Sequence, residues 1–422
     1  MRESVHPLER SLGMHYYASD TPGLGGRLRT SAQDFIVEEV PCQVGDEGPY
    51  LVCRLTKKDW ELQRAVKELA KRLGISHRRI GWAGTKDRRA VTSQLISLYD
   101  ITPEQVAKVD VKDMRLEVVG RSRTGLTLGA LEGNRFHITI REIETDILEE
   151  VVAEVTEACR QGIPNYFGVQ RFGVIRPLTH LVGEAILRGD YETAVCCYAG
   201  QAFPDEPPEV QKARKTFLET RDPVAALHSF PVPLTYERSM LHHLVSHPGD
   251  FRGALLVLAP KLRSMFVSAF QSWLFNMPLS ARLREGRGLT DPAPGDRLIF
   301  VNGKEDRVTQ AGVPAARVQI ARGRCRIGIF MPGSVEFVPE GRDEENMARL
   351  LAECGITPAQ FDAASEYVGT YFNGAIRPIS LSAEIDARVE DRNLVLSFTL
   401  PPGHYATTVC REYMKADPLM MV

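Results

Sequence analysis

The 422-residue sequence has no long apolar run and no paired-cysteine motif. No stretch approaches the ~20 uninterrupted apolar residues that a membrane helix requires. Residues 1–12 mix acids and bases without the apolar centre of a secretion signal. None of the eight cysteines forms a Cys-x-x-Cys pair, and no histidine cluster accompanies them. We therefore expect a cytoplasmic protein with free thiols, no metal and no membrane contact.

The sequence also lacks tandem repeats, low-complexity segments and motifs for a nicotinamide or flavin cofactor. Its 43% hydrophobic content is ample for buried cores and argues against disorder. At this length, two domains are the default expectation. Strand and helix patterns mix without strict βα alternation, which favours an α+β fold with a largely antiparallel sheet flanked by helices.

Alternating apolar residues predict several strands in the first part of the chain: 33–41, 50–55, 80–83, 91–99, 115–119, 126–130 and 135–141. We expect the first two to pair with each other and Gly133-Asn134 to form a hairpin turn. Asp59 is expected to cap a helix over residues 60–73, which Gly74 ends.

Helical patterns dominate the middle of the chain, over residues 146–161, 179–188, 191–199, 261–285, 343–353 and 358–366. Pro278 is expected to kink or split the long one, and Thr357 to cap the last. Residues 295–339 read as short strands. Strands return over 379–389 and 394–400, before a C-terminal helix. Because the chain ends on strands like those of its first part, we expect 169–377 to be a domain inserted between 1–168 and 378–422.

A local excess of positive charge lies between residues 51 and 90, although the net charge of the whole chain is only −2. Twelve bases face four acids there, a balance of +8. Such a stretch suits a phosphate-backbone partner, but on charge alone a solvated helix face is an equally good interpretation. The twelve are Arg54, Lys57, Lys58, Arg64, Lys67, Lys71, Arg72, Arg78, Arg79, Lys86, Arg88 and Arg89.

A single carboxylate, Asp87, stands among Lys86, Arg88 and Arg89 at the end of this stretch. The pattern of residues 80–94 predicts a strand, a turn at Gly84 and a second strand. Nearby positive charge favours the ionised carboxylate, which could serve as a nucleophile or an anchor for a positive partner. Taken alone, an exposed charged hairpin is the simpler interpretation.

Five separate stretches together resemble the TruD family of tRNA pseudouridine synthases. The order and spacing of the matches extend over nearly the whole chain. The matching stretches are Asp34-Phe35-Ile36-Val37-Glu38-Glu39, Gly84-Thr85-Lys86-Asp87-Arg88-Arg89-Ala90-Val91-Thr92-Ser93-Gln94, Gly133-Asn134-Arg135-Phe136, Pro164-Asn165-Tyr166-Phe167-Gly168-Val169-Gln170-Arg171-Phe172-Gly173 and Leu400-Pro401-Pro402-Gly403-His404-Tyr405-Ala406-Thr407 with Arg411-Glu412.

The resemblance implies a split pseudouridine-synthase domain interrupted by an inserted TRUD domain. It also implies the isomerisation of uridine 13 of tRNA, in which the N1–C1′ bond is broken and C5 is joined to C1′. Asp87 matches the catalytic aspartate. The resemblance further places Phe35, Asn134 and Tyr405 around the target nucleotide, and Phe136 against the target base.

Two basic residues carry weaker expectations. Arg29 occupies a position, six before Phe35, where a lysine is common in the family, so the positive charge is retained. Lys86 adjoins Asp87, but neighbours in an extended chain point to opposite faces. Another base brought in by folding could therefore hold Asp87 ionised. One family departure is Asp59-Trp60-Glu61, where an Asn and a Thr are common.

The chemistry leaves several alternatives open. Asp87 could attack C1′ or C6, or take a proton from C2′, and none of these routes needs a redox cofactor or a metal. The competing functions are a non-catalytic RNA-binding protein on the same fold and a nucleosidase that releases uracil. Aromatic residues on strands usually pack inward, so Phe35 and Phe136 could instead belong to the core. We expect tRNA as the partner, no protein partner, and a monomer.

Overall fold

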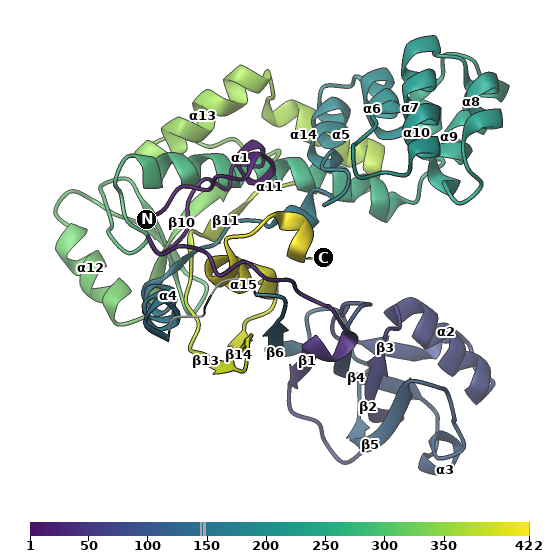
Figure 1. Cartoon of the computed structure of the whole chain (residues 1–422), viewed down its shortest axis with the longest axis horizontal. Coiled ribbons are helices and arrows are strands. Elements are labelled where there is room, and N and C mark those ends of the chain that lie inside the picture. The colour runs from purple at the N-terminus through teal and green to yellow at the C-terminus, as the bar shows by residue number, and fades with distance from the viewer. Residues whose placement is uncertain (144–145, 147–148, 422) are drawn as a thin grey trace. The chain divides into compact units, whose positions relative to one another are not determined.

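The computed structural model describes residues 1–143, 146 and 149–421, and their contacts divide the chain into two compact units (Figure 1). The first, which we call the helical unit, comprises Met1–Tyr17 and Pro164–Leu381. The second, the sheet unit, comprises Ala18–Ile163 and Ser382–Val422. Two stretches far apart in sequence build each unit. Compared with the domains expected from sequence, residues 1–17 lie in the helical unit, and the other boundaries differ by at most five residues.

A mixed eight-stranded sheet forms the centre of the sheet unit, and its strand order is β13-β14-β6-β1-β4-β2-β5, with β3 also paired to β4. All its pairs are antiparallel except β1 with β4. The expected α+β class with a largely antiparallel sheet is confirmed. The strands are β1 (Phe35–Pro41), β2 (Tyr50–Lys58), β3 (Ile80–Trp82), β4 (Val91–Tyr99), β5 (Met114–Ser122), β6 (Leu131–Ile140), β13 (Ile385–Glu390) and β14 (Asn393–Leu400).

Helices cover parts of this sheet. Helix α2 packs beside β3 in Figure 1, and its apolar residues join a core with Leu55, Ile80 and Ile96. Helix α4 contacts β13 and α15. The helices are α2 (Leu62–Leu73), α3 (Pro103–Val106), α4 (Glu149–Gln161) and α15 (Ala406–Met414). The expected start of α4, before Glu149, lies partly outside the described residues.

Along one of its sides, strand β4 pairs with two different strands. Strand β1 pairs with it at residues 91–93 and β3 at residues 96–98. Between them the amide of Leu95 is left without a ladder partner and donates instead to Glu39 Oε1 at 3.2 Å. A gap therefore lies along β4 between the residues that pair with β1 and those that pair with β3, and we call it the seam. The loop of residues 83–90 runs from the end of β3 to the start of β4.

Several local predictions were wrong for steric or pairing reasons. Strands β1 and β2 do not pair, because β4 lies between them. Residues 126–130 form no strand, since Leu126 donates to Ser97 Oγ and Gly129 turns with a positive φ of 95°. Gly133 is no hairpin turn but part of β6, where an added Cβ would lie 2.6 Å from the Leu400 carbonyl oxygen.

Helix α2 begins two residues later than the sequence indicated, at Leu62. Asp59 has a left-handed φ of 57° and does not cap the helix. The carboxylate of Glu61 does so, accepting the amides of Gln63 and Arg64. The expected end at Gly74 is confirmed, with a φ of 66°.

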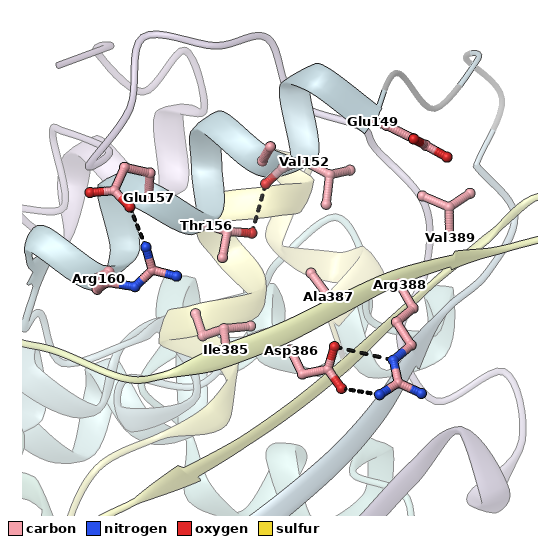
Figure 2. A pocket seen from close by; sticks show the side chains of 11 residues that line it. Glu149, Val152, Thr156, Glu157, Arg160, Ile385, Asp386, Ala387, Arg388 and Val389 are labelled. Atoms are coloured by element: carbon pink, nitrogen blue, oxygen red, sulfur yellow. Dashed lines mark hydrogen bonds and ion pairs between the residues drawn. The ribbon is translucent and has the colours of Figure 1, made fainter.

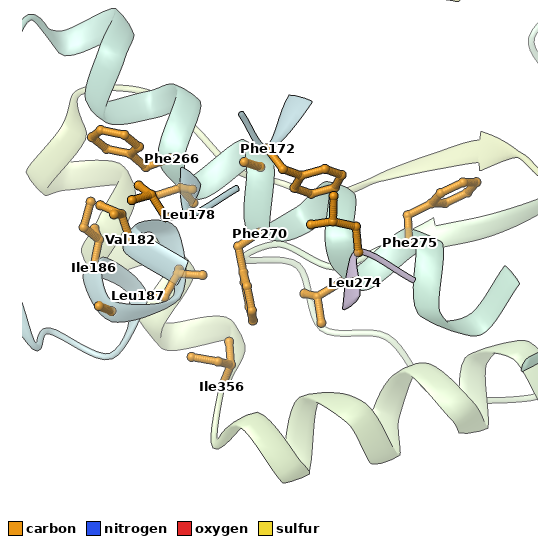
Figure 3. Close-up of a cluster of buried hydrophobic side chains, with 14 of the residues drawn as sticks. Phe172, Leu178, Val182, Ile186, Leu187, Phe266, Phe270, Leu274, Phe275 and Ile356 are labelled. Atoms are coloured by element: carbon orange, nitrogen blue, oxygen red, sulfur yellow. The ribbon is translucent and has the colours of Figure 1, made fainter. Parts of the chain in front are cut away.

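In the helical unit α11 contacts α5, α13, α14 and β10, and Phe266 of α11 lies close to Val182 of α5 in Figure 3. A four-stranded sheet, ordered β11-β10-β8-β9, lies in the same unit. Its helices are α1 (Pro7–Ser11), α5 (Thr179–Leu187), α6 (Tyr191–Gly200), α7 (Pro208–Thr220), α8 (Pro223–Ser229), α9 (Thr235–Ser246), α10 (Phe251–Leu256), α11 (Pro260–Arg284), α12 (Val313–Ala321), α13 (Arg342–Cys354) and α14 (Pro358–Val368). Its sheet comprises β8 (Arg297–Phe300), β9 (Glu305–Arg307), β10 (Cys325–Met331) and β11 (Ala375–Pro378).

Two expectations for this unit need correction. Of the kink or split expected at Pro278, the split does not occur, since α11 continues to Arg284 with many of its residues buried in the core. Helix α12 replaces one of the short strands expected over residues 295–339. The cap of α14 is confirmed as a box between Thr357 and Gln360. No helix within the described ranges is long and apolar enough to cross a membrane.

Candidate active site

Asp87 lies in the loop of residues 83–90, which connects the paired strands β3 and β4. The two expected strands are confirmed, but the loop of residues 83–90 joins them instead of a turn at Gly84. Both ends of the loop are tied down, because the amide of Gly129 donates to Ala83 and that of Asp59 to Ala90. The Asp87 side chain nevertheless remains 48% exposed. The loop is therefore fixed at its base while its carboxylate stays open to solvent.

Arg29 is the base that faces the Asp87 carboxylate. Its Nη2 lies 3.4 Å from Asp87 Oδ1, and the arginine side chain is only 6% exposed. The guanidinium also lies 3.9 Å from the ring centroid of Phe35 and donates to the Met421 carbonyl. Arg29 takes a left-handed φ of 55°, a conformation unfavourable for a residue with a Cβ. These contacts thus hold the buried Arg29 guanidinium in position beside the exposed Asp87 carboxylate.

Lys86 turns away from Asp87, as strand geometry had suggested was possible. Its Nζ lies 2.7 Å from Glu39 Oε2, and both side chains are buried. The same Glu39 carboxylate accepts the Leu95 amide at the seam in the sheet. Gly84 leaves room for this pair, since an added Cβ would lie 2.9 Å from Lys86 Nζ.

Glu39 is a site residue that the sequence analysis did not single out. A signal was present, because the alternation of β1 places Glu39 on the same side as Phe35 and Val37, which are buried. A charged residue on the buried face of a strand requires a partner. Its partner, Lys86, is distant in sequence and could not be identified from the pattern.

The aromatic candidates pack together on neighbouring strands. Phe35 and Phe136 meet edge to face with ring centroids 6.3 Å apart, and Phe136 stacks on Phe398 at 5.4 Å. Phe136 is 6% exposed and Phe35 only 1%. Phe398 was not predicted from sequence. Packing therefore orients Phe136 firmly, whether its role is in the core or against a base.

One face of the sheet aligns polar and aromatic candidates in cross-strand rows. Thr92 pairs with Lys57 on one side and with Val37 on the other, and Val37 pairs with Phe136. Residues paired in this way lie on the same face of a sheet. This face of the sheet therefore carries both the buried Lys57 and the aromatic residues around Phe136.

Three side-chain oxygens on this face are buried without a hydrogen-bond partner among the described residues: Thr92 Oγ1, Gln94 Oε1 and Asn134 Oδ1. Gln94 uses its Nε2 to hold the Gly84 carbonyl of the Asp87 loop at 2.9 Å. Buried polar atoms normally find partners. Unpaired acceptors on the sheet face to which the Asp87 loop is tied indicate a place where a ligand's donors could bind.

Tyr405 stands apart from the other candidates. It precedes α15, five residues after the end of β14, and is 36% exposed. Among the described residues it makes no hydrogen bond or ring contact with Asp87, Asn134 or Phe136.

The long motif of residues 164–173 belongs to the helical unit. The Phe167 amide donates to Asn276 Oδ1, and Tyr166 shares a hydrogen bond with Ser280, both on α11. Arg377 stacks over Phe167 at 4.0 Å. These contacts account for the motif as a packing element of its own unit.

A groove of about 590 Å³ between α4 and β13 contains none of the predicted site residues (Figure 2). Its charges pair with one another, for example Arg388 with Asp386 and Arg160 with Glu157. No group of three or more His, Cys, Asp or Glu side chains within the described residues could hold a metal ion.

Comparison with known proteins identifies the family. The family model for tRNA pseudouridine synthase D (TruD) matches residues 11–413. A Methanosarcina acetivorans protein named "Probable tRNA pseudouridine synthase D" is 41% identical over 438 aligned positions, which cover 99% of both chains. A Pyrococcus furiosus protein of the same name is 39% identical, covering 94% of this chain and 98% of its own.

A solved structure gives the same result. The crystal structure of the Methanosarcina mazei TruD chain superimposes with a TM-score of 0.85 at 38% identity, covering 98% of this chain and 99% of its own. The family model and the relatives span nearly the whole sequence. The chain therefore belongs to the tRNA pseudouridine synthase D (TruD) family.

Proposed function

We propose that this protein converts uridine 13 of tRNA to pseudouridine and that Asp87 is its catalytic residue. The observation that carries the proposal is the open Asp87 carboxylate, which a buried Arg29 faces at 3.4 Å. The arginine places a positive charge beside this carboxylate. An ionised, accessible carboxylate can attack C1′ or C6 of the nucleotide, or accept a proton from C2′.

The surrounding groups suit an extruded uridine. Turning a stacked base out of tRNA costs about a few kcal/mol, and aromatic stacking returns ~1–3 kcal/mol. Phe136, oriented by Phe35 and Phe398, supplies such a ring. The unpaired Asn134 Oδ1 could accept the N3–H of uracil. The family resemblance is the support for including Tyr405 and Phe35 in the pocket, while Lys86 contributes indirectly by fixing the loop through Glu39.

The experiment is to incubate the protein with unmodified tRNA and to map pseudouridine. We expect modification at position 13, abolished in Asp87→Asn while tRNA binding is retained. The substitution keeps the side chain's size and exposure but removes its charge. Activity that survives in Asp87→Asn would refute the catalytic assignment.

Two further outcomes separate the alternatives. Binding of tRNA without any modification by the wild type would indicate a non-catalytic RNA-binding protein. Release of free uracil would indicate a nucleosidase. Modification at another position would retain the enzyme class and reject the assignment of uridine 13.

A further inference from the structure

Two of the twelve bases between residues 51 and 90 are buried, and both contact the Asp87 region. Lys86 pairs with Glu39, as described above. Lys57, at the end of β2, is 1% exposed and has no carboxylate within ion-pair distance among the described residues. A buried ammonium group without an ion pair is unusual, so its contacts require an explanation.

The ammonium group of Lys57 bridges two loops. Its Nζ donates to the Trp60 carbonyl at 2.7 Å and to the main-chain carbonyl of Asp87 at 3.0 Å. The first loop connects β2 to α2, and the second carries the candidate catalytic residue. Hydrogen bonds from a charged donor are the stronger ones in proteins. Lys57 therefore anchors Asp87 itself, at its backbone, to the rigid end of a central strand.

The buried positive charge of Lys57 lowers the stability of the folded protein. Burial lowers the pKa of Lys57 to about 8, against the opposing attraction of Asp87 and Glu61, and with a further lowering by Lys86. An apolar side chain of similar length would fill the space without that desolvation. A residue that costs stability beside a functional group is typical of a functional site.

We infer that Lys57 is a positioning residue for the proposed reaction, holding the main chain of Asp87 so that its carboxylate meets the nucleotide in one orientation. The inference rests on the proposed role of Asp87. Arg29 and Lys57 hold different parts of Asp87. Arg29 faces the carboxylate oxygen, whereas Lys57 fixes the carbonyl of the same residue.

The first test compares Lys57→Met with the wild type in single-turnover pseudouridine formation and in tRNA affinity. Misplacement of a reacting group by about 1 Å can cost ~10²-fold in rate, and we expect a loss of that order. The Kd should change by less than ~twofold, because phosphate contacts dominate affinity. Lys108→Met, which changes an exposed lysine elsewhere in the sheet unit, serves as the control.

A rate within ~twofold of the wild type in folded Lys57→Met would overturn the inference. Equal losses of rate and affinity would also overturn it, since they would indicate an RNA contact or a general structural defect. Thermal melting of both variants establishes that the compared proteins are folded.

The second test does not depend on activity. Hydrogen exchange of peptides covering residues 83–90 should be at least about tenfold faster in Lys57→Met, as expected from the loss of a charge-assisted hydrogen bond. Unchanged exchange would show that Lys57 does not tether the loop. If the wild type proves inactive on tRNA, the proposed function fails, yet this measurement still decides whether Lys57 anchors Asp87.

Discussion

Two clusters of buried charge, one in each unit, are built in opposite ways. In the helical unit, Arg282 is fully buried and uses all its donors, on the carboxylates of Asp296 and Asp343 and the carbonyls of Gly288 and Asp291. Burial acts to lower the pKa of Arg282, but Asp343 and Asp296 outweigh it and raise that pKa.

The cluster around Asp87 in the sheet unit is left incomplete. Its carboxylate is half exposed, its lysine bonds carbonyls, and acceptors such as Asn134 Oδ1 lack partners. A saturated network stabilises one structure, whereas an unsaturated one retains interactions for a ligand. The difference predicts that substitutions in the first cluster change stability and those in the second change activity.

The largest effect on stability is expected from Arg282→Met. It removes the buried cation that joins Asp296 and Asp343 and leaves these carboxylates only Arg287, and breaking a buried ion pair costs about 3–5 kcal/mol. Denaturation followed through Trp273, on α11 of the same unit, would measure the loss. Arg317→Met, which breaks an exposed pair with Asp291, should cost no more than about 1 kcal/mol. Comparable losses in both variants would contradict the comparison.

The next effect concerns the pH dependence that Lys57 gives to stability. Its pKa is about 8 in the folded protein and ~10.4 when unfolded. Between these values the unfolded state binds more protons, so stability rises with pH. The free energy of unfolding of the wild type, relative to Lys57→Met, should therefore increase by roughly 2 kcal/mol from pH 8 to 10.5. Urea titrations at several pH values would measure it, and a flat difference would contradict it.

Arg29→Met tests the cation that faces Asp87. We expect pseudouridine formation to slow by about 10- to 100-fold, because the carboxylate loses both its charge partner and its fixed position. Arg27→Met is a matched control, since Arg27 pairs with Glu142 on the surface. Single-turnover rates on the same tRNA would give the comparison. Equal effects in the two variants would show that the charge at Arg29 has no special role.

The smallest effect is expected for Phe136→Leu, which retains an apolar side chain but removes the ring. Loss of stacking predicts a rate about tenfold lower, with little change in tRNA affinity. Phe398→Leu, its stacked neighbour, should destabilise to a similar degree and slow the reaction less. Equal losses of rate and affinity in Phe136→Leu would assign the ring to the core.

The sequence by itself determined the elements and the family. Periodicity located β1 and α2, because each buries one regular face. It also located β4 and α11, although both are buried on more than one side. The same periodicity failed at Gly133, whose role is close approach to a neighbouring strand rather than a turn. It also failed for the pairing of β1, since strand order depends on contacts between distant segments.

Only the tertiary structure decided which bases serve Asp87. Lys86, Arg88 and Arg89 adjoin it in sequence, yet Lys86 binds Glu39, and the two arginines are exposed. Arg29 and Lys57 reach it from other parts of the chain. A run of charges along a sequence carries no information on which members are buried. The burial of Lys57 and Arg29 depends on how strands β2, β4 and β1 pair in the sheet. Burial strengthens the interactions of these two bases with Asp87.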